Sequence, residues 1–169
     1  MKIREGTNLL AGILFTLIAG TLLHFCYEWS GDNPFVALFA PVSESVWEHL
    51  KLLFFPVLVY TLFEIIVLFK VSGSFLTARV LGVILGMFFI LAAFFTYTGI
   101  IGRSFLAADI LIFALSVFVT FLSSRYLDVH CPSLNLPLLA NYALLLLIVT
   151  CFFSFTFSPP GLPMFQSPV

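Results

Sequence analysis

The chain has 169 residues, of which 62% are hydrophobic and 9% are charged, and its formal net charge is −1. Soluble domains carry roughly 25% charged residues, so this composition, with a mean hydropathy of +1.17, excludes a fold that is covered by water. The small net charge gives no indication of nucleic-acid binding, and membrane lipid is the expected partner. We therefore predict an all-α, polytopic integral membrane helix bundle.

Five stretches are long and apolar enough to cross a bilayer, which takes about 20 residues. In chain order they cover residues 8–27, 46–69, 76–98, 105–122 and 136–157. Lys2 and Arg4 precede the first stretch, but this stretch is too long for the apolar core of a cleaved signal peptide. An alternative with four spans places residues 43–55 along the membrane surface as an amphipathic helix.

Residues 1–157 are expected to form a single bundle. Residues 158–169 contain four prolines and no charge, which predicts an extended or disordered tail. The basic residues of short loops set the orientation of a membrane protein. One side carries Lys2, Arg4, Lys70, Arg79 and Arg125, and the other side carries Arg103. This asymmetry predicts a multi-pass protein of the cell membrane with a cytoplasmic N terminus.

Ionisable side chains inside a span are expensive and usually face a polar interior. The predicted topology brings five such polar residues to one outer layer: His24 and Glu28 from the first span, His49 from the second, Tyr97 from the third and Asp109 from the fourth. His24 and Glu28 are four residues apart and share a helix face. Two imidazoles with carboxylates form a ligand set that suits zinc. The candidate metal ligands are therefore His24, Glu28, His49 and Asp109.

The segment PVSESVWEHLKL, residues 41–52, begins the second span and is unusually polar for this chain. On a helix, Ser45 and His49 fall on one inward face. Glu44, Glu48 and Lys51 fall on a second stripe, which we expect to be paired near the water surface, with Ser43 capping the helix. Three residues are assigned to the wall of the polar site: Ser45, Glu48 and Tyr97.

Three functions remain open for this layer. The first is a structural network in an integral membrane protein of unknown biochemical role. The second is a metal-dependent membrane hydrolase, in which zinc would activate a water molecule against a lipid or a peptide. The third is a small transporter or ion-coupled subunit, in which Tyr60 and Glu64 would extend the polar line from His49 as a relay.

Gly82 and Gly86 form a GxxxG pair in the third span. Small residues at this spacing let two helices approach closely. The pair either packs inside the bundle or forms the contact face of a homo-oligomer.

The segment HFCYEWSGDNPFVALFAPVSESVWEHLKLLFFP, together with YTGIIG and the following Asp109, resembles a family of small bacterial integral membrane proteins. The resemblance covers most of the chain and is tightest over residues 27–56. It implies a multi-span membrane protein to which no function is assigned. It brings no catalytic residues to this chain.

Overall fold

The computed structural model describes residues 2–68 and 72–167. Its elements in chain order are α1 (Lys2–Trp29), α2 (Pro34–Ala37), α3 (Val46–Leu68), α4 (Gly73–Ile101), α5 (Leu106–His130), α6 (Leu138–Phe157) and the short 3₁₀ helix η1 (Pro163–Phe165). Among the described residues, five helices are long and apolar enough to cross a membrane, namely all but α2 and η1. The prediction of an all-α bundle with five spans is confirmed.

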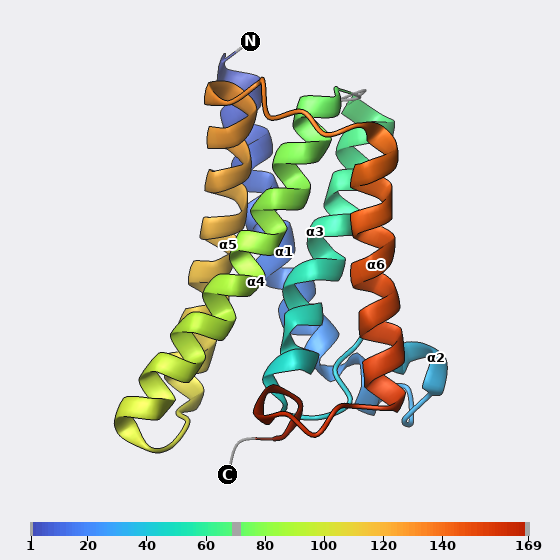
Figure 1. The fold of residues 1–169 in the computed structure, drawn as a ribbon, viewed down its shortest axis with the longest axis vertical. Helices are drawn as coiled ribbons and strands as arrows, with labels where there is room; N and C mark the ends of the chain where they lie inside the picture. The colour runs from blue at the N-terminus through green and yellow to red at the C-terminus, as the bar shows by residue number, and fades with distance from the viewer. Residues whose placement is uncertain (1, 69–71, 168–169) are drawn as a thin grey trace.

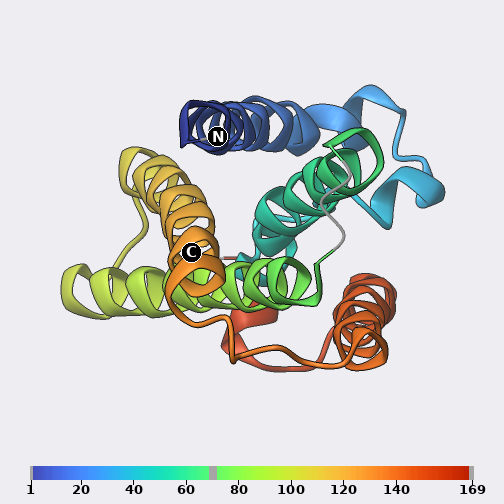
Figure 2. The ribbon, with the colours of Figure 1, turned by 90° about the horizontal axis from the view of Figure 1, so that it is seen from above.

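α3 is the central helix of the bundle. In its most apolar stretch 61% of the residues are buried, against 28% or fewer in each of the other four spans. Seen from above, α1 and α6 lie on opposite sides of α3, and α4 runs beside both α3 and α5 (Figure 2). At one end of the molecule the α4–α5 hairpin diverges from α3 and α6 (Figure 1).

α3 is one continuous helix from Val46 to Leu68 although it contains Pro56, so the alternative with four spans is wrong. Proline has no N–H, and the carbonyl four residues earlier, that of Leu52, therefore loses its helical partner. This carbonyl oxygen lies against Gly20 of α1, where a Cβ atom would collide with it. The interrupted turn of α3 thus coincides with a close approach of α1.

The glycines of the GxxxG pair pack against α5 within the chain. A Cβ atom at Gly82 would overlap Ser124, and one at Gly86 would overlap Thr120. Both glycines are buried, so the pair serves the interior of the bundle. The homo-oligomer predicted through this pair would need another surface.

The described part of the C-terminal tail packs against the bundle, and its backbone is extended on either side of one short helix. Residues 163–165 form η1, and the Phe165 ring packs against Trp47 and Phe155, with centroid distances of 5.0 and 5.3 Å. The tail packs there because Phe165 is an apolar ring and the ends of α3 and α6 present aromatic side chains that it can contact. The tail therefore covers the start of α3.

Candidate metal site

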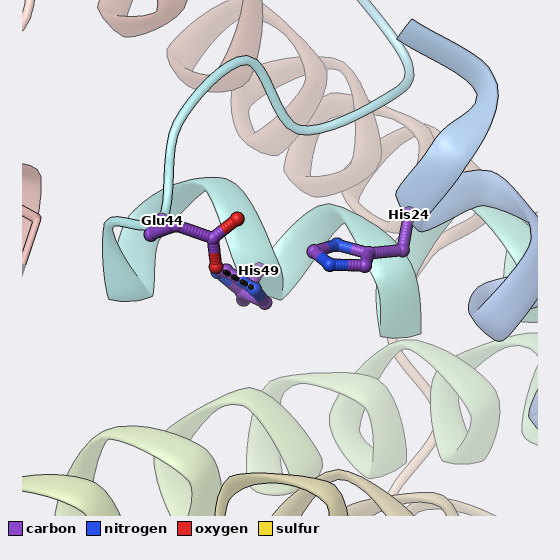
Figure 3. Close-up of side chains that lie close together, drawn as sticks. All are labelled: His24, Glu44 and His49. Carbon is purple, nitrogen blue, oxygen red and sulfur yellow. Dashed lines mark ion pairs between the residues drawn. The ribbon is translucent and has the colours of Figure 1, made fainter. Parts of the chain in front are cut away.

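α1 and α3 bring His24 and His49 together, with ring centroids 5.2 Å apart. Figure 3 shows the His24 ring directed toward His49 and the Glu44 carboxylate beside it. One potential ligand atom from each of these three residues lies within 4.8 Å of the other two. Two ligands of one tetrahedral zinc ion, each bound at about 2.1 Å, lie roughly 3.4 Å apart. A small rotation of the side chains would therefore close the group around an ion.

The orientation of the His49 ring is fixed by its own helix. Its Nδ1 atom lies 2.9 Å from the carbonyl oxygen of Ser45. A carbonyl can only accept, so Nδ1 carries the proton and donates. In the neutral ring Nε2 then presents a lone pair, and this atom lies 3.4 Å from Glu44 Oε2. This lone pair faces the carboxylate, and the two groups together are suited to hold a cation.

His24 supplies a second imidazole whose hydrogen bonding is incomplete. Its Nδ1 atom is buried and has no hydrogen-bond partner in the part of the chain that the structure describes. The ring packs edge-on against Phe25, with centroids 5.1 Å apart. Buried polar atoms without a partner are uncommon in folded proteins, so this nitrogen indicates a place where a ligand could bind.

Glu44 opens the group to solvent. Its side chain is 69% exposed, whereas that of His49 is 30% exposed. Glu44 was not predicted to lie in the site, because a helical projection was applied to it although it precedes Val46, where α3 begins. In the turn before a helix, the carboxylate reaches forward to the ring of His49.

The other predicted metal ligands lie outside this group. Glu28 is exposed at the end of α1. Asp109 accepts a hydrogen bond from the Tyr97 hydroxyl, which in turn accepts from the Phe105 N–H at 3.2 Å. These contacts fasten the turn between α4 and α5, which lies at the tip of the diverging hairpin (Figure 1). The predicted layer therefore divides into two separate sets.

The predicted wall residues Ser45 and Glu48 are both buried. The Ser45 hydroxyl accepts from the Glu48 N–H at 3.3 Å, so Ser45 caps α3, and the assignment of the cap to Ser43 is wrong. Serine is favoured at this position because its oxygen accepts from an N–H of the first turn.

The expectation that Glu48 and Lys51 lie near the water surface is also wrong. The Lys51 side chain is fully buried, and its ammonium group donates to the Ala37 carbonyl at 2.8 Å, to Glu48 at 2.8 Å and to Thr156 at 2.6 Å. The loop around α2 and the end of α6 cover this stripe of α3. The pair therefore belongs to the interior and links three elements.

The two residues of the predicted relay have other partners. The Tyr60 hydroxyl donates to the Asn8 carbonyl at 2.7 Å, and Glu64 accepts from Arg79 at 2.5 Å. No hydrogen bond joins Tyr60 to Glu64 within the described residues. The ion pair of Glu64 with Arg79 was not predicted from the sequence. Their similar distances from the α3–α4 connection, on either side of it, are the signal that would have indicated the pair.

The fold and the site together define a multi-pass integral membrane protein with a group of side chains that could hold a metal ion. The chain belongs to a family of unknown function (DUF6512), which matches residues 3–169. This agrees with the resemblance to a family without an assigned function. Comparisons with curated proteins and with solved structures gave no significant match.

Proposed function

We propose that this protein binds a divalent metal ion through His24, Glu44 and His49, and that the ion is zinc. The observation that carries the proposal is the orientation of His49. A metal-binding histidine usually donates its other ring nitrogen to a carbonyl or a carboxylate, as His49 Nδ1 does toward Ser45. Its Nε2 atom then faces the Glu44 carboxylate, and the second imidazole lies alongside.

Two histidines and one carboxylate make up the protein ligands of many catalytic zinc sites, which leave a fourth position for water. This ligand count, together with the exposure of Glu44, favours a metal-dependent membrane hydrolase as the second candidate function. Its substrate would be a lipid or a peptide that reaches the group at the membrane surface. The transporter hypothesis gains no support, because Tyr60 and Glu64 have other partners.

The test is elemental analysis and zinc titration of the full-length protein, purified in detergent. We expect about one zinc ion per chain in the wild type. His24→Ala and His49→Ala should lose the ion because each removes a nitrogen ligand. Glu44→Gln should bind at least about tenfold more weakly, because a neutral amide replaces the carboxylate; a tenfold change corresponds to about 1.4 kcal/mol.

Two matched controls keep the test specific. His130 is exposed at the end of α5 and lies outside the group, so His130→Ala should bind zinc as the wild type does. Glu28 was predicted from the sequence as a metal ligand but lies outside the group in the structure. Glu28→Gln should therefore also bind zinc as the wild type does. A wild-type protein without stoichiometric zinc would contradict the proposal and leave His49 and Glu44 as an ion pair.

A further inference from the structure

A polar cavity lies far from the histidines along α3. Glu64, in its lining, follows His49 by about four helical turns, a rise of about 22 Å. The cavity has a volume of about 140 Å³ and is lined by side chains from α1, α3, α4 and α5. The polar lining residues are Glu64, Arg79, Ser124, Arg125 and Asp128.

Arg79 is the unusual member of this lining. Its side chain is 10% exposed. Among the described residues its guanidinium group makes one hydrogen bond, from Nη2 to Glu64. Its Nε and Nη1 atoms are buried and have no hydrogen-bond partner among the side chains and backbone that the structure describes. A guanidinium group has five N–H donors, so most of its donors are unsatisfied.

Aromatic rings hold the guanidinium group in place without satisfying these donors. The centre of the group lies 4.6 Å from the Phe121 ring centroid and 5.3 Å from that of Phe75. Rings in this position favour the positive charge, but they do not replace an acceptor in the plane of the N–H groups. The cavity therefore offers buried donors that require an acceptor.

The charges of the lining define the acceptor. Arg79 and Arg125 carry two positive charges, and Glu64 and Asp128 carry two negative charges, so the lining is formally neutral. The unsatisfied groups are donors, which select an oxyanion. The two carboxylates oppose a highly charged guest, so a single negative charge fits best, as in a phosphodiester. Arginine also matches the planar arrangement of two phosphate oxygens.

The position of the cavity agrees with a lipid phosphate. Arg125 and Val129 of its lining are exposed, and Leu9 lies near the first residue of the α1 span. These residues are at the ends of their spans, at the depth of the headgroups, where basic pockets between helices bind anionic lipids. We propose that this cavity binds a phosphate oxyanion of single negative charge, supplied by a phospholipid headgroup or as free phosphate.

The experiment uses the full-length protein, stripped of lipid in detergent, with binding followed by native mass spectrometry. Phosphatidylglycerol is the lipid probe, diacylglycerol is the probe without phosphate, and inorganic phosphate is the free anion. We expect phosphatidylglycerol to be retained and diacylglycerol not to be. Arg125→Gln should weaken retention severalfold. The double variant Arg79→Met/Glu64→Gln, which removes both charges of the buried pair, should weaken it at least about tenfold.

Arg103→Gln is the matched control, because it removes one positive charge beyond the far end of α4. It should retain phosphatidylglycerol as the wild type does. Binding of inorganic phosphate that is lost in Arg79→Met/Glu64→Gln would support the proposal with free phosphate as the source. Retention that is equal for the two lipids, or unchanged in the double variant, overturns the proposal. So does a cavity that binds neither phosphate probe and holds only water.

Discussion

Lys51 is a charged residue in an apolar interior, and its contacts show how such a residue is stabilised there. It is fully buried, and a buried charge is tolerated only when hydrogen bonds replace its lost hydration. Its partners come from the carbonyls beside α2 and from Thr156 of α6. A helical projection of α3 alone cannot show them, because they lie 11 to 105 residues away in sequence. For this reason the sequence placed Lys51 at the surface.

Removing the Lys51 charge should destabilise the protein strongly. Lys51→Met leaves the Glu48 carboxylate buried without its cation, and breaking a buried pair in this way costs about 3–5 kcal/mol. Lys51→Met/Glu48→Gln should recover much of this loss because no unpaired charge remains. The measurement is denaturant unfolding of the purified variants in detergent. A single variant that is as stable as the wild type would show that Glu48 has another source of compensation.

Helices α4 and α5 form a hairpin, and different contacts hold the two helices together at its middle and at its tip. Near its middle, Gly82 and Gly86 let the backbone of α4 approach Thr120 and Ser124. At its tip, the Tyr97 hydroxyl donates to Asp109. The hairpin is therefore held together by its own contacts where it diverges from α3. The depth of Asp109 could be predicted from the sequence, but the lateral divergence that separates it from His49 could not.

Adding a side chain at Gly82 should weaken the packing of α4 against α5. Gly82→Val places a branched side chain against Ser124, and overpacking of this kind costs about 1–3 kcal/mol. Gly99→Val is the matched control, because it makes the same change on α4 where no atom lies within 4 Å. The midpoint of unfolding in detergent should be lower for Gly82→Val than for Gly99→Val. Equal stability of the two variants would mean that α5 shifts at no cost.

At the scale of the whole molecule, the membrane spans could be predicted from the sequence because they depend on hydropathy. Several contacts between neighbouring helices could not, because they depend on lateral packing. All five spans were identified, since each is a long apolar run. The pairing of His24 with His49 followed from their depth, because α1 and α3 are also neighbours in space. Glu44 was left out of the site since it precedes its helix, and Arg79 was left unpaired because its partner lies on another helix.

An odd number of spans places the two ends of the chain on opposite sides of the membrane. With the predicted cytoplasmic N terminus, a cysteine at Asp32→Cys should react with an impermeant maleimide from outside intact cells. A cysteine at Ser133→Cys, in the loop between α5 and α6, should react only after permeabilisation. Both changes are made in a chain whose three native cysteines are replaced by alanine. The reverse pattern of labelling would invert the orientation.

The central position of α3 has a consequence for biosynthesis. This helix carries Glu48, Lys51 and Glu64, and each charge raises the cost of entering the bilayer from the translocon. Arg79, which pairs with Glu64, emerges from the ribosome soon after α3, but Thr156 emerges only with the last span. The start of α3 therefore lacks the Thr156 hydroxyl as a partner for Lys51 until the last span has been made.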